Sequence, residues 1–178
     1  LGEQLVRHAA ELRRRRQQVA VRDEAMAAHG VIGELIQRRR GDTLCAHGEP
    51  YAFFLYPGAS DRLLIDFIGG GACWDEKTCG GKDVFEDSTD TLREYVRTRY
   101  SYGIYHKKRT DNPFHQDWHL MITYCTADIH WGDATVQYGD ETVHHRGAAI
   151  ARAALDFVYR ALPAPSRVSV IGCSAGAY

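Results

Sequence analysis

One stretch near the end of the chain decides its fold: VSVIGCSAG, residues 168–176. Its first four residues are rich in valine and isoleucine and indicate a short buried strand. The next five fit the pattern G-x-S-x-G, which is typical of a nucleophile elbow. In such an elbow the serine sits at a strained strand-to-helix turn, and glycine on either side lets neighbouring backbone pack closely. We therefore expect Ser174 to project its hydroxyl above the sheet, with the N–H of Ala175 facing a future oxyanion.

A helix is predicted directly before this strand. Apolar residues recur on one helical face between Gly147 and Leu162, and Pro163 and Pro165 close the segment. Helix, short loop, buried strand and elbow is the order that an α/β-hydrolase requires. An ordinary glycine-bearing turn after a core strand is the alternative for the pentapeptide taken alone.

The position of the elbow in the chain raises a difficulty. In an α/β-hydrolase the acid and the histidine of the triad follow the serine, yet only four residues follow Ser174. The first residue is Leu rather than Met. We therefore expect either a piece of a longer protein, truncated after the elbow, or a serine that is not catalytic.

The composition is that of a globular domain, with 178 residues of which 44% are hydrophobic and 25% charged. A net charge of −1 and a pI near 6.8 argue against a general nucleic-acid binder. No apolar run approaches the roughly 18–20 residues that span a bilayer. Of five cysteines, Cys73 and Cys79 lack zinc-site spacing, and a small disulfide loop between them is the better interpretation. That disulfide would indicate an oxidising compartment: a secreted, periplasmic or membrane-anchored protein facing outside.

Residues 1–42 form a separate block, which we expect to be a helical N-terminal extension. Its first forty residues contain nine arginines and no lysine, and apolar residues recur at loosely helical spacing. The run Arg13–Arg16 is compatible with contact to an anionic membrane surface or a protein partner. A solvated helix face, or the juxtamembrane end of an anchor, is the simpler interpretation.

Residues 43–178 alternate between strands and turns. Strands are predicted at 51–56, 63–68 and 120–124, the first two as an antiparallel pair, and a helix is predicted at 89–100. The second strand runs into Gly69-Gly70-Gly71, where three glycines let backbone N–H groups face a pocket, as the second half of an oxyanion hole needs. A structural turn and a phosphate-binding loop are the alternatives, although neither phosphate-loop motif is present.

Asp128 and His130 suggest a catalytic pair at first sight. Two residues apart on an extended segment, their side chains project to the same side rather than toward each other. We therefore expect a structural or pocket-rim role for Asp128 and His130, and we count Asp128, His130 and Trp131 as candidate substrate-binding residues. A metal pair is the alternative, but the sequence offers it no further ligands, so no metal site is expected. The adjacent His144 and His145 precede the predicted helix, so an exposed or capping role is expected for both.

Four motifs in the same order resemble the pectinacetylesterase family, to which the animal Notum carboxylesterases are similar. The motifs are Gly69–Trp74 with Cys79, Asn112–Phe114 with Trp118, Tyr124–Gly132, and Gly172–Gly176. The resemblance extends from about Cys45 to the last residue. Ala72 and Ala177 depart from the family pattern, which affects the shape of the pocket.

The resemblance implies an α/β-hydrolase that cleaves esters with a Ser-Asp-His triad and without metal or cofactor. The nucleophile falls on Ser174, and the oxyanion-hole donors fall on Gly70, Gly71, Ala72 and Ala175. The triad acid and histidine would lie beyond Tyr178. The expected fold is thus an incomplete α/β-hydrolase three-layer sandwich with a mixed, mostly parallel sheet.

The predicted function is that of a serine ester hydrolase acting on an O-acylated substrate, foremost an O-acetylated carbohydrate. Its other expected partner is the remainder of its own hydrolase domain. Two alternatives stay open. One is a lipase or carboxylesterase that acts on lipidic esters, and the other is a hydrolase-like subunit kept for binding or structure without catalysis.

Overall fold

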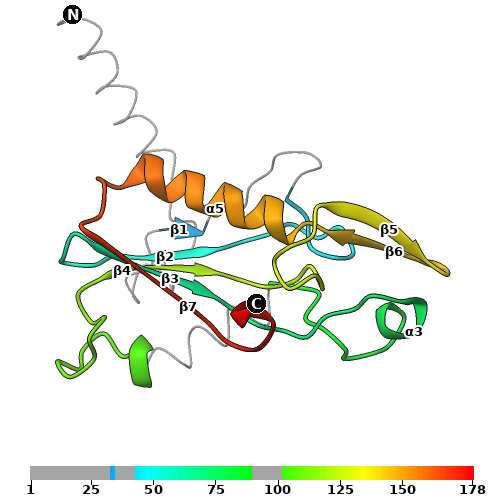
Figure 1. Ribbon diagram of the computed structural model, residues 1–178, viewed down its shortest axis with the longest axis horizontal. Coiled ribbons are helices and arrows are strands. Elements are labelled where there is room, and N and C mark those ends of the chain that lie inside the picture. Colours follow the sequence, from blue (N-terminus) through cyan, green and yellow to red (C-terminus); the bar gives the residue numbers. More distant parts are fainter. Residues whose placement is uncertain (1–32, 35–42, 90–101) are drawn as a thin grey trace, which may run out of the picture.

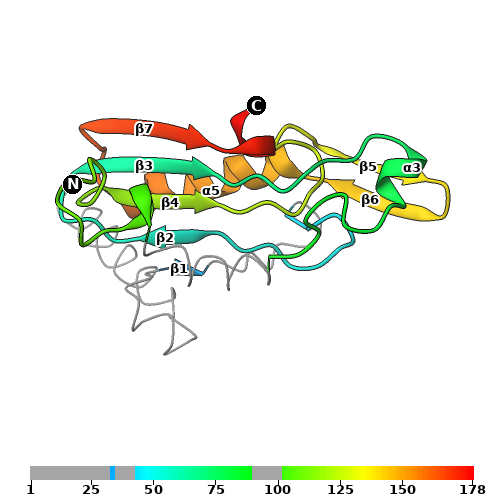
Figure 2. The same cartoon turned by 90° about the horizontal axis from the view of Figure 1, so that it is seen from below.

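The computed structural model describes residues 33–34, 43–89 and 102–178. In this part of the chain a mixed sheet of five strands has the order β1-β2-β4-β3-β7 (Figures 1 and 2). β3, β4 and β7 are parallel to one another, whereas β2 is antiparallel to β4 and to β1. The sheet is therefore mixed, as predicted, although only two of the four strand pairings in the described residues are parallel. Its strands are β1 (Gly33–Glu34), β2 (Phe54–Tyr56), β4 (Trp118–Ile122), β3 (Arg62–Phe67) and β7 (Arg167–Gly172).

The strands predicted at 51–56 and 63–68 correspond to β2 and β3. Their predicted antiparallel pairing is wrong, because β4 lies between them. The short β2–β3 connection crosses the start of β4 at Gly58, where a Cβ atom would lie 2.3 Å from the backbone nitrogen of Trp118. The N–H of Ser60 then donates to the carbonyl of Gln116. Only a glycine permits this approach, so the connection can straddle a strand that joins the sheet later in the chain.

Helix α5 (Gly147–Ala161) covers one face of the sheet (Figure 1). It has the bounds predicted from the sequence to within one residue, and Ile150, Ala154 and Val158 are buried on it. These three pack with apolar side chains from β2, β3 and β4 in a single core. Burying each such side chain stabilises the fold by roughly 1.5–3 kcal/mol. Side chains alternate between the two faces of a strand, so every second residue points toward the helix. The strand residues in this core are Leu55, Leu63, Ile65, Leu120 and Ile122.

The opposite face of the sheet carries a buried polar pair. Asp66 on β3 and His119 on β4 are buried, with Asp66 Oδ2 3.3 Å from His119 Nε2. The ring of Tyr105, from the short helix η1 (Gly103–Tyr105), stacks on His119. Burial lowers the pKa of His119, the nearby charge of Lys107 lowers it further, and Asp66 opposes both. His119 is therefore neutral in the folded protein at neutral pH.

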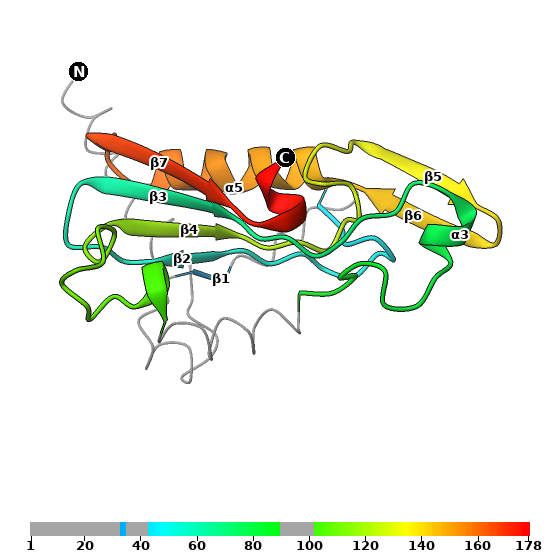
Figure 3. The same cartoon turned by 60° about the horizontal axis from the view of Figure 1, so that its bottom comes forward.

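A hairpin lies beyond the carboxyl ends of the parallel strands, beside the short helix α3 (Glu76–Cys79) (Figure 3). Its strands are β5 (Ala134–Tyr138) and β6 (Glu141–His145), and its turn at Gly139 packs against Glu76 of α3. This hairpin is not among the elements predicted from the sequence. The signal that could have indicated it is the turn dipeptide Gly139-Asp140 between two short segments in which apolar and polar residues alternate.

The hairpin corrects the roles expected for two histidines. His144 and His145 belong to β6 and do not cap the helix, and His145 is buried. Two disulfides hold this end of the molecule, Cys73–Cys79 and Cys45–Cys125. The first is the small loop expected from the spacing.

The N-terminal extension predicted for residues 1–42 contributes β1 to the sheet through Gly33 and Glu34. Its predicted helices, the run Arg13–Arg16 and the helix predicted at 89–100 lie outside the described residues. No helix in the described part of the chain is both long and apolar enough to cross a bilayer.

The buried His119 predicts how stability depends on pH. Its folded-state pKa is below the unfolded value of 6.5, so the unfolded chain binds more protons below pH 6.5 and stability falls as the pH falls. We expect this group to contribute a loss of up to about 1.4 kcal/mol per pH unit as the pH falls below its unfolded-state pKa. Urea unfolding at several pH values measures the slope. His119→Gln should make the slope shallower, and an unchanged slope would contradict the assignment.

Candidate functional site

The elbow at the end of β7 has the geometry that its sequence predicts. After Gly172 the chain turns through Cys173 into the short helix η2 (Ser174–Ala177). Ser174 has a φ of +54°, in the left-handed region that non-glycine residues rarely adopt. Its side chain is exposed, whereas Ala175 is buried. The predicted strain at Ser174 is thus present, and such strain is found preferentially at functional sites.

Two glycines make the turn possible through close backbone contacts. A Cβ atom on Gly172 would lie 2.0 Å from the carbonyl oxygen of Gly176. A Cβ atom on Gly176 would lie 2.0 Å from the carbonyl oxygen of Phe67, at the end of β3. The elbow is therefore pressed against the end of the neighbouring strand, and no side chain fits between them.

Gly69, the first residue of the glycine run after β3, contacts the elbow. A Cβ atom on Gly69 would lie 2.2 Å from the carbonyl oxygen of Cys173, 2.8 Å from Cβ of Ser174 and 3.0 Å from the nitrogen of Ala175. The residues whose N–H groups are predicted to face the oxyanion come directly after Gly69. A role of Gly70, Gly71 and Ala72 as oxyanion-hole donors stays a prediction.

The rest of the glycine run packs against another segment. The N–H of Glu86 donates to the carbonyl of Gly70 at 2.7 Å, and Gly71, with a φ of +77°, forms a bridge with Phe85. A Cβ atom on Gly71 would lie 2.1 Å from the carbonyl oxygen of Val84. Glycine is thus required here both for its backbone conformation and for the space it leaves.

The loop after β4 is held together by the carboxylate of Asp128. Its Oδ1 accepts hydrogen bonds from the hydroxyl of Thr126 at 2.7 Å and from the backbone N–H of His130 at 3.1 Å. Its Oδ2 accepts from the N–H of Gly147, the first residue of α5, at 2.7 Å. A negative charge at a helix N-terminus is also favourable for the helix dipole. Asp128 therefore has a structural role, and its carboxylate is not paired with the His130 ring.

His130 lies beside the end of β3 rather than in solvent. Its ring is buried between the rings of Phe67 and Tyr124, and burial lowers the pKa of His130. The neighbouring Trp131 is 68% exposed. A substrate-binding role for Asp128, His130 and Trp131 stays a prediction.

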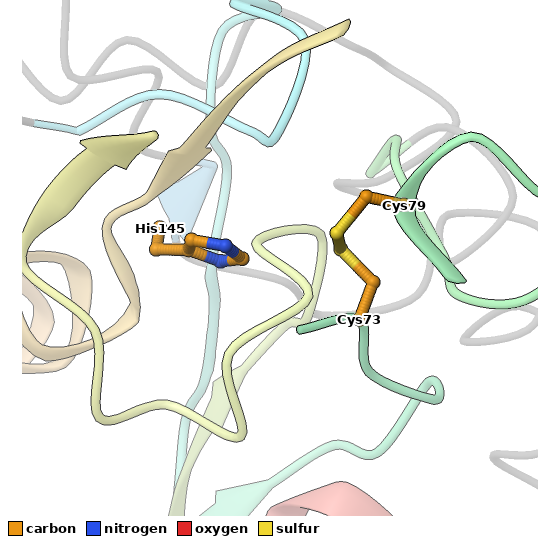
Figure 4. Close-up of side chains that lie close together, drawn as sticks. All are labelled: Cys73, Cys79 and His145. Carbon is orange, nitrogen blue, oxygen red and sulfur yellow. A yellow bond between two sulfur atoms is a disulfide. The ribbon is translucent and has the colours of Figure 1, made fainter. Parts of the chain in front are cut away.

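Two sulfurs and an imidazole, those of Cys73, Cys79 and His145, lie close together (Figure 4). The ligand-type atoms of Cys73, Cys79 and His145 are within 4.8 Å of one another. The cysteines are joined in a disulfide, so neither sulfur is a thiolate. The ring nitrogens of His145 lie 3.0 Å from the carbonyl oxygen of Thr126 and 3.1 Å from the hydroxyl of Tyr138. Both ring nitrogens of His145 thus have hydrogen-bond partners, which accounts for its burial. With the two sulfurs joined to each other, these three residues offer no free ligand to a metal.

Two further features surround the serine. Cys173, directly before Ser174, is an exposed free cysteine. Within residues 43–89 and 102–178, no hydrogen bond joins the Ser174 hydroxyl to a histidine. A general base of the kind that a triad needs is thus not among the hydrogen-bond partners of this serine in the described residues, and the role of Ser174 as a nucleophile stays a prediction.

The chain matches the model of a known protein family. The family model described as pectinacetylesterase matches residues 26–178. The match begins upstream of Cys45, so the resemblance extends further toward the N-terminus than the motifs alone indicated, and it includes β1. No curated protein matches the chain at a significant level.

The elbow packing predicts a large cost for one added methyl group. Gly176→Ala would place a Cβ atom 2.0 Å from the carbonyl oxygen of Phe67, so the backbone must shift. We expect a loss of about 2 kcal/mol or more in the free energy of unfolding. Gly80→Ala is the matched control, since its φ is −85° and its Cβ atom would approach only the carbonyl oxygen of Glu76, at 3.0 Å. Equal, small effects of the two substitutions would refute the predicted contact.

The Asp128 network predicts a second stability effect. Asp128→Ala removes the acceptors of three hydrogen bonds, two of them from backbone N–H groups. We expect a loss of about 3 kcal/mol in the free energy of unfolding, measured by chemical denaturation. Asp133→Ala is the control, because Asp133 forms only half-exposed ion pairs with Arg146 and Arg152 and should lose less than about 1 kcal/mol. A loss for Asp128→Ala no larger than this control would contradict the structural role.

Proposed function

This chain belongs to the pectinacetylesterase family, and from that premise we propose that it is a serine ester hydrolase whose nucleophile is Ser174. One observation carries the proposal. Ser174 has a φ of +54° at the carboxyl end of a parallel strand, in contact with the glycine run at the end of the adjacent strand. This combination supports the proposal, because acyl transfer requires an exposed hydroxyl beside preorganised backbone N–H groups.

In the proposed mechanism, the Ser174 oxygen attacks the ester carbonyl carbon, and the carbonyl oxygen becomes an oxyanion. The N–H of Ala175 and N–H groups of the run Gly70–Ala72 stabilise that charge by roughly 3–4 kcal/mol per donor. A histidine takes the serine proton and returns it to the leaving alcohol, and an acid orients the histidine. The acyl-enzyme is then hydrolysed by water. We place the histidine and the acid in sequence that follows Tyr178.

The same proposal accounts for the exposed edge of the sheet at β7. Among the described residues, β7 pairs only with β3, and Val168 and Val170 on it are exposed by 44% and 62%. In a complete three-layer α/β-hydrolase, further strands and a helix after the elbow cover this side. We therefore expect residues 1–178 alone to be inactive, and we expect the remainder of the domain to bind along β7.

The proposed substrate is an O-acetylated carbohydrate, the class that the family name indicates. The two disulfides support an oxidising location, which we propose to be secreted, periplasmic or membrane-anchored and facing outside. Polysaccharide esters are found in such compartments, so location and substrate agree.

Substitution of the nucleophile tests the proposal. In active protein, Ser174→Ala should lower kcat for an acetyl ester at least about a thousandfold and abolish labelling by a fluorophosphonate probe. Ser169→Ala, on the same strand, is the matched control and should retain activity. Cys173→Ser tests whether the adjacent thiol contributes, and it too should retain activity.

The outcomes separate the rival functions. Hydrolysis that persists in Ser174→Ala would overturn the proposed nucleophile. Intact protein whose Ser174 fails to react with the probe would favour a binding or structural subunit without catalysis. A panel of acetyl and long-chain esters distinguishes a carbohydrate deacetylase from a lipase, because the lipase would prefer the long acyl chains.

A further inference from the structure

The side chain of His130 reaches the peptide that begins the glycine run. Nε2 of His130 lies 2.8 Å from the carbonyl oxygen of Ile68. A carbonyl only accepts hydrogen bonds, so Nε2 carries the proton and donates it. The ring itself packs against Phe67, edge to face at 5.1 Å, and against Tyr124 at 5.0 Å. Two aromatic contacts and burial therefore restrict the position of the donor.

The backbone around His130 is held in an uncommon conformation by hydrogen bonds. Ala127, Ile129 and His130 all have positive φ values, between 53° and 65°. Non-glycine residues adopt this conformation at a cost, so the surrounding contacts must hold it. Those contacts are the Asp128 carboxylate, which accepts from the His130 N–H, and the Tyr124 hydroxyl, which accepts from the Ile129 N–H at 2.9 Å. A strained loop is thus maintained, and it presents one N–H donor to Ile68.

The acceptor belongs to a peptide that needs such support. The carbonyl of Ile68 and the N–H of Gly69 are parts of one planar trans peptide and point in opposite directions. Holding the carbonyl therefore sets the direction of the Gly69 N–H. Without a bonded carbonyl this peptide could rotate easily, because glycine allows nearly all backbone conformations. Gly69 is also the residue of the run that contacts the Cys173 carbonyl and Ser174.

We propose that His130 is a positioning residue for the oxyanion hole: its Nε2–H bond to Ile68 fixes the peptide from which the glycine run starts toward Ser174. The inference rests on the proposed esterase function and goes beyond it by assigning a task to a residue outside the triad. His130 acts through Ile68 and Gly69 and takes no part in proton transfer. The strained loop from Ala127 to His130 serves to deliver this donor.

Three substitutions separate the donor from the volume of the side chain. His130→Gln can place an amide N–H where Nε2 lies, His130→Asn carries the same amide on a side chain one methylene too short, and His130→Phe keeps an aromatic ring without a donor. We expect His130→Asn and His130→Phe to lower kcat for an acetyl ester by about tenfold to a hundredfold, with KM changed less than about threefold. His130→Gln should stay within about threefold of wild type. All are measured in the active full-length protein, with thermal unfolding to verify that each variant is folded.

The pH–rate profile gives a second readout that a general loss of stability does not produce. A donor that only positions a peptide leaves the acidic limb of the profile unchanged in His130→Gln, whereas loss of a general base would abolish that limb. If His130→Phe does not fold, the comparison of His130→Gln with His130→Asn decides the question alone.

Four results would overturn the inference. They are a kcat for His130→Gln as low as that of His130→Asn, a kcat for His130→Asn equal to that of wild type, a rise in KM at constant kcat, and loss of the acidic limb in His130→Gln. Ser174→Ala distinguishes the two levels of the account. If Ser174→Ala abolishes hydrolysis while the His130 variants match wild type, only the role of His130 fails. If Ser174→Ala still hydrolyses the ester, the proposed function fails and the role of His130 fails with it.

Discussion

The candidate site depends on one constraint, the direct contact of backbone with backbone between the end of β3 and the elbow after β7. Gly69 lies against Cys173, and Gly176 lies against Phe67, at separations that no Cβ atom can enter. These contacts hold Ser174 in a left-handed conformation that serine would not otherwise adopt. Because the parallel register of β3 and β7 places Phe67 opposite Gly172, the sheet sets the distance between Ser174 and the glycine run.

A second layer of contacts supports the first from the side. Asp128 joins the loop after β4 to the start of α5, and His130 joins the same loop to Ile68. The N–H of Cys73 donates to the carbonyl of Ala127, which ties the glycine run to that loop as well. Helix, loop, glycine run and elbow are therefore one connected unit. In this unit a partly buried carboxylate and a buried imidazole hold the backbone in place, so these polar side chains stabilise the geometry of the site rather than the core.

The sequence predicted the local elements of this site better than their assembly. The periodicity of α5, the apolar strands and the glycine spacing around Ser174 are properties of short segments, so they could be predicted directly. Strand pairing was not, because the insertion of β4 between β2 and β3 depends on residues sixty positions apart and on a clash-free crossing at Gly58. The Asp128 and His130 side chains are not hydrogen-bonded to each other, as expected, but the extended segment on which that expectation rested is wrong, since Ala127, Ile129 and His130 have positive φ values. The partners of these side chains lie at the start of α5 and at the end of β3, which no pattern in one sequence specifies.

The most direct test of the account is a crystal structure of the active protein inhibited by a small phosphonate ester. The account predicts a covalent bond from Ser174 Oγ to phosphorus, with the phosphoryl oxygen within about 3 Å of the Ala175 N–H and of an N–H in the glycine run. A phosphonate attached to another residue, or a phosphoryl oxygen directed into solvent away from these amides, would contradict it.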